Sequence, residues 1–233
     1  MPLFFIDYWY VILVVPMIIF SLIMSANVKS TYSKYVGVRC RSGITGAEAA
    51  RRILLANGIT DVQLAVCGGE LTDHYDPRKR VVSLSADVFN SSSVAAVGIA
   101  AHEVGHVCQH YSGYAPIKIR NAVLPIANIG SSLSVPLIIA GFIFSFRPLV
   151  LAGVIAFAAV VLFQLVTLPV EFNASSRAMK SLVSCGILSQ DETSGTRKVL
   201  TAAAMTYVAS LAVSLAQLLR LILIARNLSL IHI

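Results

Sequence analysis

The chain has 233 residues, of which 57% are hydrophobic and only 12% are charged, and its formal net charge is +7. Soluble domains carry about 25% charged residues, roughly twice the fraction found here. The high hydrophobic and low charged fractions exclude a disordered chain and a coiled coil, and the composition also excludes a disulfide-stapled secreted domain. It also argues strongly against a soluble globular enzyme. We therefore expect an integral membrane protein.

Four long windows without any charged residue predict four membrane-spanning helices. They are residues 8–28, 121–146, 148–170 and 199–219, and each reaches the roughly 20 residues that a helix needs to cross a bilayer. The first follows an acid, Asp7, and no Ala-x-Ala cleavage site closes it. We interpret it as an uncleaved anchor and not as a signal peptide.

The basic residues predict which side of the membrane the connecting segments occupy. Fifteen of the 18 lysines and arginines lie within residues 29–120 and 171–198, and the positive-inside rule assigns these segments to the cytoplasm. Arg220, near the end of the fourth window, is expected to extend its charge to the outer interface together with Arg226, and the alternative is a buried functional charge. Nucleic-acid binding is not expected, because the basic residues alternate with acids.

The predicted organisation follows from these windows. It comprises an N-terminal anchor (1–28), a cytoplasmic catalytic portion (29–120), a transmembrane hairpin (121–170), a second cytoplasmic segment (171–202) and a C-terminal helix with its tail (203–233). The fold class is a polytopic α-helical membrane protein with a small mixed α/β cytoplasmic portion.

Within the cytoplasmic portion the pattern predicts, in chain order, an amphipathic helix over 42–57, strands over 61–66 and 80–85, and an apolar helix over 94–110. Three serines precede this last helix and are suited to cap it. The four cysteines lack Cys-x-x-Cys spacing and are expected to be reduced, mostly buried thiols; they are Cys40, Cys67, Cys108 and Cys185.

The helix over 94–110 contains His102-Glu103-Val104-Gly105-His106, an HExxH motif. Residues four apart lie one above the other on a helix face, so both imidazoles can bind one Zn²⁺. Glu103 projects beside them and can reach a metal-bound water, as zinc-assisted hydrolysis requires. The alternative is a chance match, but burying these polar side chains without a metal would cost several kcal/mol.

A catalytic zinc site usually has three protein ligands. A ligand ten positions after His102 would be Ser112, a poor ligand, and His110 lies too far along the helix axis, about 12 Å from His102. Glu171 is the better third ligand, because the transmembrane hairpin leaves and returns to the same face. A solvated interfacial glutamate is the alternative, while Asp191 and Glu192 resemble an ordinary helix N-terminal pair.

Three stretches resemble the YugP-type neutral zinc metallopeptidases of bacterial membranes: residues 69–77 (GELTDHYDP), 101–110 (AHEVGHVCQH) and 168–175 (LPVEFNAS). The resemblance implies His102, His106 and Glu171 as zinc ligands and Glu103 as catalytic acid/base. It also implies kinship with HtpX-like membrane gluzincins and a place in the bacterial inner membrane. In their Glu-x-x-Ala-Asp pattern the last position is Ser175 here, so a carboxylate behind a zinc histidine is in question.

Further candidates lie near these motifs. His74 and Tyr75 are suited to donate to a developing oxyanion, although their neighbours are turn residues. Alternatively, this segment leads into residues 81–85 as an edge strand that pairs with an extended peptide. Arg177 is a similar donor candidate, with an interfacial anchor as its alternative role.

The sequence thus predicts a membrane-embedded zinc endopeptidase that cleaves protein or peptide substrates, membrane-associated or unfolded, at the cytoplasmic membrane face. A non-catalytic zinc scaffold is the main alternative. A small transporter is disfavoured, because few polar residues (Asn128, Gln164 and Gln217) occur in the spans.

Overall fold

The computed structural model of the protein describes residues 7–69 and 72–228. Glu70 and Leu71, part of the stretch at 69–77, lie outside the described residues. The chain divides into two units. Unit 1 contains the described parts of Met1–Ser25, Lys118–Leu168 and Thr206–Ile233, and unit 2 contains Ala26–Ile117 and Pro169–Met205.

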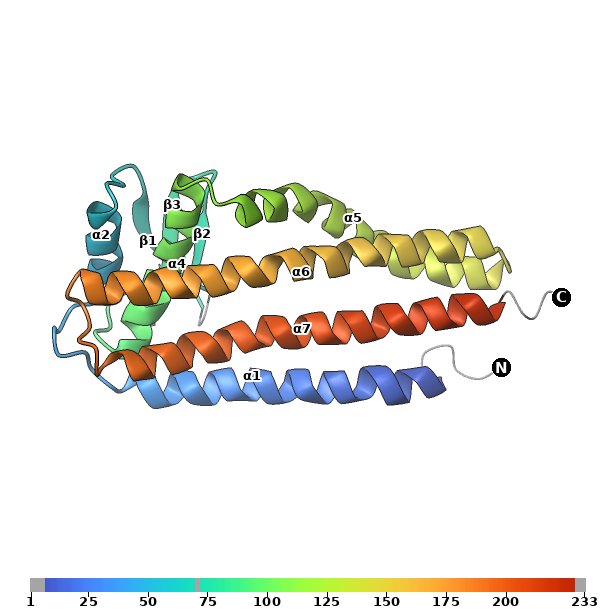
Figure 1. Ribbon diagram of the computed structural model, residues 1–233, viewed down its shortest axis with the longest axis horizontal. Coiled ribbons are helices and arrows are strands. Elements are labelled where there is room, and N and C mark those ends of the chain that lie inside the picture. Colours follow the sequence, from blue (N-terminus) through green and yellow to red (C-terminus); the bar gives the residue numbers. More distant parts are fainter. Residues whose placement is uncertain (1–6, 70–71, 229–233) are drawn as a thin grey trace. The chain divides into compact units, whose positions relative to one another are not determined.

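Four long helices carry the four apolar windows. They are α1 (Val15–Val36), preceded by a π-helical turn (Tyr10–Val14), then α5 (Ala115–Ile143), α6 (Arg147–Ser184) and α7 (Thr193–Leu228) (Figure 1). Within the part of the chain that is described, these four are long and apolar enough to cross a membrane. This confirms the expectation of four such helices.

Helices α6 and α7 extend well beyond the predicted spans. Helix α6 continues through Pro169 to Ser184, and α7 begins at Thr193. Proline removes one backbone hydrogen bond from a helix, yet Pro169 does not end α6. The residues predicted as a separate segment after position 170 are therefore largely continuations of the same two helices.

Small residues allow α5 and α6 to approach closely within unit 1. A Cβ atom added at Gly130 would lie 2.3 Å from the carbonyl oxygen of Ala156, and one added at Gly153 would lie 2.8 Å from that of Ser134. Such contacts are typical of helix pairs in membranes, where close backbone packing replaces the hydrophobic effect.

Arg220 is buried in unit 1, so the expectation of an exposed charge was wrong and the alternative of a buried charge agrees with the structure. Its Nε and Nη2 atoms donate to Oδ2 of Asp7 at 2.8 and 2.6 Å. The guanidinium also lies 5.0 Å from the centre of the Tyr10 ring and contacts Gln217. The carboxylate of Asp7 offsets the free-energy cost of burying the Arg220 charge. The local sequence around Arg220 does not reveal this partner.

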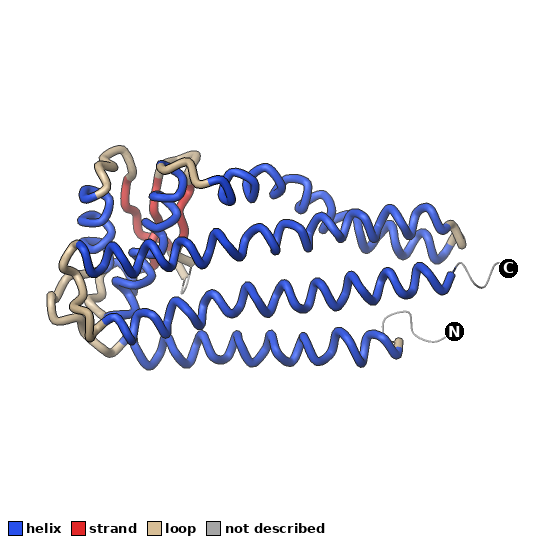
Figure 2. Tube along the Cα trace, viewed as in Figure 1, coloured by secondary structure: helices blue, strands red, loops and turns tan. Residues whose placement is uncertain are grey.

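Unit 2 contains a three-stranded mixed sheet, drawn in red in Figure 2. Strand β3 (Val81–Ser85) is central, parallel to β1 (Gln63–Cys67) and antiparallel to β2 (His74–Asp76). The prediction that residues 81–85 form an edge strand was therefore wrong. A tight turn after Asp76, with Arg80 at a positive φ of 53°, folds β2 back onto β3 and covers that edge.

Helices α2 (Gly46–Ala56), α3 (Ala86–Phe89) and α4 (Val94–Tyr111) complete the core of unit 2. Thr45 caps α2 and Ser93 caps α4, each by accepting a backbone N–H three residues later. Helix α4 is buried along most of its length, as its predominantly apolar sequence requires. It therefore holds any side chain it carries in a fixed position.

Candidate metal centre

Helix α4 and helix α6 bring two histidines and a glutamate together within unit 2. Nε2 of His102 lies 3.3 Å from Oε2 of Glu171, and Nε2 of His106 lies 3.7 Å from the same oxygen. The three ligand atoms all lie within 4.8 Å of one another. The predicted pairing of the HExxH histidines with a glutamate more than 60 positions away is thus present in the structure.

The donor set fits a zinc ion. Zinc binds imidazole nitrogen and carboxylate oxygen at about 2.0–2.2 Å, so ligand atoms around a tetrahedral ion lie about 3.4 Å apart. The separations of 3.3 and 3.7 Å match this spacing. Glu171 is only 3% exposed. Burying its carboxylate beside two imidazole nitrogens costs free energy unless these groups bind a cation or share a proton.

Gly105, inside the HExxH motif, explains how α6 comes close enough to supply Glu171. A Cβ atom at Gly105 would lie 2.6 Å from the carbonyl oxygen of Ala174, one turn beyond Glu171. Real Cβ atoms essentially never come so close to another atom, so only glycine allows this separation of α4 and α6. Ala174 is itself fully buried and carries only a methyl side chain.

Each histidine has a hydrogen-bond partner on the ring nitrogen that faces away from the cluster. Nδ1 of His102 lies 3.1 Å from the hydroxyl of Ser175, and Nδ1 of His106 lies 3.0 Å from Oε1 of Gln109. Such partners orient metal-binding imidazoles and keep Nε2 free for the ion. Ser175 therefore occupies the place questioned in the sequence, with a neutral hydroxyl instead of a carboxylate.

Gln109 is a site residue that the sequence reasoning missed. It is fully buried, and its Nε2 donates to the carbonyl of Val170 at 2.7 Å and to Oδ1 of Asn173 at 3.1 Å. It thus ties His106 to the turn of α6 that carries Glu171. Its spacing of three residues after His106 places it on the same helix face, which was the available signal.

Glu103 lies beside the cluster with its carboxylate uncommitted. Its side chain is buried and makes no hydrogen bond to another described residue. Burial works to lower the pKa of His106, but hydrogen bonding to Glu171 and the charges of Glu103 and Glu171 raise it above its usual value. Glu103 follows His102 directly on α4, so its charge lies close enough to His106 to contribute to this raised pKa.

The three further candidates make other contacts. His74 is exposed on β2, with Nδ1 2.8 Å from the carbonyl of Thr72. The Tyr75 hydroxyl is buried without a hydrogen-bond partner among the described residues, and burial raises its pKa to about 12. Arg177 donates to Asn173 at 2.8 Å and lies over the Tyr114 ring.

The rival candidates have other surroundings. His110 stacks edge-on against Tyr75 and Tyr111. Asp191 pairs with Arg41, and Glu192 accepts the Ser189 hydroxyl near the start of α7. All four cysteines are free. Burial raises the pKa of the Cys108 thiol, which disfavours the thiolate that a nucleophile needs.

Comparison with known proteins agrees with this geometry. Residues 10–226 match the family described as "Putative neutral zinc metallopeptidase". The chain is also 48% identical over 201 residues to "Putative membrane protease YugP" of Bacillus subtilis (strain 168), covering 86% of this chain and 89% of that one. No solved structure matches the chain. With zinc as the family's metal and a fitting His-His-Glu cluster, the chain belongs to this family of neutral zinc metallopeptidases.

Proposed function

We propose that the protein is a membrane-embedded zinc-dependent endopeptidase of the gluzincin type, with His102, His106 and Glu171 as ligands and Glu103 as catalytic acid/base. The observation that carries the proposal is the convergence of the three ligand atoms around one point, with an uncommitted buried carboxylate beside it. The family match and the name of the Bacillus relative support a protease.

The residues divide the chemistry between them. Zinc in such a site lowers the pKa of water and polarises a carbonyl. Glu103 takes the proton from the attacking water and passes it to the leaving amine. Ser175 and Gln109 hold the two imidazoles so that their Nε2 atoms stay directed at the ion. No covalent bond between a side chain and the substrate is required.

The proposal includes donors for the developing oxyanion. His74, Tyr75 and Arg177 remain the candidates, and Tyr75 has the feature most suited to this role. Its hydroxyl is buried and has no hydrogen-bond partner among residues 7–69 and 72–228. At a pKa of about 12 it stays protonated at neutral pH and can donate a hydrogen bond.

The proposal places the site at the cytoplasmic face of the bacterial inner membrane. The support is the excess of basic residues in the segments that contain the site, together with four apolar helices. Substrates at this position would be protein or peptide chains that are membrane-associated or unfolded. The anchor over 1–28 and the hairpin over 121–170 are part of this proposed organisation.

The alternative is a zinc-binding scaffold without turnover. Structural zinc sites are closed by four protein ligands, often cysteines. The cluster in the described part of the chain offers three groups and no cysteine, which leaves one position for water and substrate. The endopeptidase is therefore the better supported function.

Replacing Glu103 by Gln separates the two functions. The purified zinc-loaded variant should keep its zinc stoichiometry but lose about 10²–10⁴-fold of its cleavage rate on an unfolded protein such as casein. A chelator should abolish cleavage by the wild type. Glu48→Gln, at a half-exposed glutamate on α2 that pairs with Arg51 and Arg52, is the matched control. Near wild-type cleavage by Glu103→Gln would overturn the proposal.

A further inference from the structure

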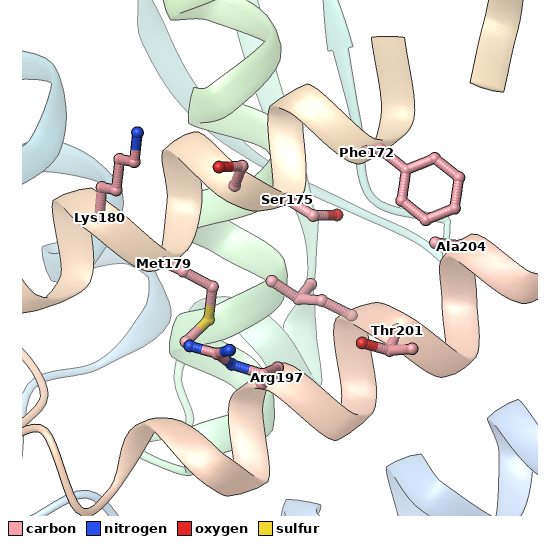
Figure 3. Close-up of a pocket in the computed structure, with 9 residues that line it drawn as sticks. Phe172, Ser175, Met179, Lys180, Arg197, Thr201 and Ala204 are labelled. Carbon is pink, nitrogen blue, oxygen red and sulfur yellow. The ribbon is translucent and has the colours of Figure 1, made fainter. Parts of the chain in front are cut away.

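A pocket of about 340 Å³ lies between α6 and α7 in unit 2, separate from the metal-binding atoms (Figure 3). Its lining residues come from two stretches of helix: Phe172, Ser175, Ser176, Met179 and Lys180 on α6, and Arg197, Leu200, Thr201 and Ala204 on α7. Nothing in the catalytic scheme uses it as a binding site.

The two ends of this pocket differ in chemistry. Lys180 and Arg197 lie toward one end, and Phe172 and Ala204 lie at the other (Figure 3). Both cations are exposed, and neither forms an ion pair with an acid in the described part of the chain. Two cations without a carboxylate partner line the same pocket, and this favours an anion.

The floor between these ends is apolar. Leu200 and Ala204 are buried, Met179 is half-buried, and the hydroxyls of Ser176 and Thr201 are exposed beside them. A small anion alone would leave this apolar length uncovered. The occupant that matches both features has a charged head and a hydrocarbon chain.

The polarity follows the direction of the two helices. Going from Lys180 to Phe172 along α6 leads toward the charge-free window at 148–170, and going from Arg197 to Ala204 along α7 leads into the one at 199–219. The cationic end is thus the end farther from the apolar core of each window. A phospholipid has the same order, with its headgroup outside its acyl chains, and basic pockets between membrane helices bind anionic headgroups.

We propose that this pocket binds one anionic phospholipid molecule. Its phosphate lies between Lys180 and Arg197, and the hydroxyls of Ser176 and Thr201 donate to the headgroup oxygens. One acyl chain follows Met179, Leu200 and Ala204 toward Phe172. Ser175 lines the pocket and also lies beside Nδ1 of His102, but the lipid contacts proposed here use the other lining residues.

The test measures lipid binding to the full-length protein purified in an uncharged detergent. Native mass spectrometry follows titration with phosphatidylglycerol, with phosphatidylcholine of the same acyl chains, and with glycerol phosphate. The variant is Lys180→Gln/Arg197→Gln, and the charge-matched control is Lys118→Gln/Lys198→Gln, which removes two exposed lysines outside the pocket.

The wild type and the control should bind phosphatidylglycerol, and the pocket variant should bind it about 25-fold more weakly, since each cation contributes about fivefold. Equal binding by the variant and the control would overturn the proposal. So would equal affinity for phosphatidylcholine, or for glycerol phosphate, or displacement of the lipid by an acidic peptide. Glu103→Gln should bind the lipid like the wild type, so failure of the peptidase proposal does not affect this result.

Discussion

Units 1 and 2 bury their side chains in opposite ways. In unit 2, core residues such as Val97, Ala101 and Val104 on α4 are fully buried against the sheet, α2 and α6. In the described part of unit 1, a smaller cluster of buried apolar residues comprises Ile138, Val154 and Leu221. The apolar windows of the four long helices are only 6% to 33% buried.

This contrast shows where each unit obtains its stability. Unit 2 has a core of the kind that water-soluble domains use, and its polar site groups are held by named hydrogen bonds. Unit 1 exposes large apolar side chains such as Ile155 and Ile129, which a lipid environment covers. Substitutions in one unit should therefore leave the specific property of the other unaffected.

The largest expected effect on stability belongs to unit 1. Asp7→Ala removes the carboxylate that pairs with buried Arg220, and breaking such a pair costs about 3–5 kcal/mol. The thermal unfolding midpoint in detergent should fall sharply, while zinc stoichiometry of the folded protein stays unchanged. The double variant Asp7→Ala/Arg220→Met should recover most of the loss. A single variant no less stable than the double one would show that the pair contributes little.

In unit 2, Glu171→Ala removes a proposed ligand. Losing a hydrogen-bond partner of a ligand typically weakens metal binding roughly 10- to 100-fold, and loss of a ligand itself should weaken zinc binding by more than this. The thermal unfolding midpoint of the variant in zinc-free buffer should be no lower than that of the wild type. Zinc titration with a competing chelator measures the first quantity. Glu192→Ala, on the loop before α7, is the control. Unchanged metal content would remove Glu171 from the ligands.

Gly105→Ala tests the close approach of α4 and α6. The added Cβ would meet the Ala174 carbonyl, and overpacking of this kind costs about 1–3 kcal/mol. Both the unfolding midpoint and zinc affinity should decrease, because Glu171 moves with α6. Gly37→Ala, where a Cβ would meet no atom within 4 Å, should have neither effect. Equal behaviour of the two variants would refute the packing argument.

The smallest expected effect concerns Ser175. Ser175→Ala removes the hydroxyl beside Nδ1 of His102 and should weaken zinc binding about tenfold. Ser175→Asp should restore or increase the affinity, because a carboxylate is a stronger acceptor for the imidazole N–H. Ser176→Ala is the control on the next residue. A tenfold loss in that control would assign the effect to α6 and not to the hydrogen bond.

The sequence predicted the long helices and the HExxH motif better than the contacts between helices. Charge-free windows predicted the long helices of unit 1, and helical spacing predicted that His102 and His106 share a face. The roles of Gln109 and Ser175 escaped prediction because they depend on how α4 and α6 pack, which side-chain periodicity within one helix does not contain. Strand β2 escaped because its three residues lie among turn formers.

The wrong prediction for Arg220 has a different cause. Its ion-pair partner, Asp7, lies 213 positions earlier in the chain. A local window around Arg220 shows only a charge near the end of an apolar run, for which extension to the interface is the ordinary expectation. Long-range pairing of single charges leaves no pattern in the sequence. The HExxH spacing does leave one, and Glu171 is marked by its position directly after the hairpin.

The Asp7–Arg220 pair also constrains the order of biogenesis. The carboxylate at the start of the first long helix is synthesised long before the guanidinium on the last one. During that interval Asp7 has to remain hydrated or bind another cation, since an isolated buried carboxylate is strongly disfavoured. Unit 1 therefore reaches its final packing only when α7 has been synthesised and Arg220 can pair with Asp7.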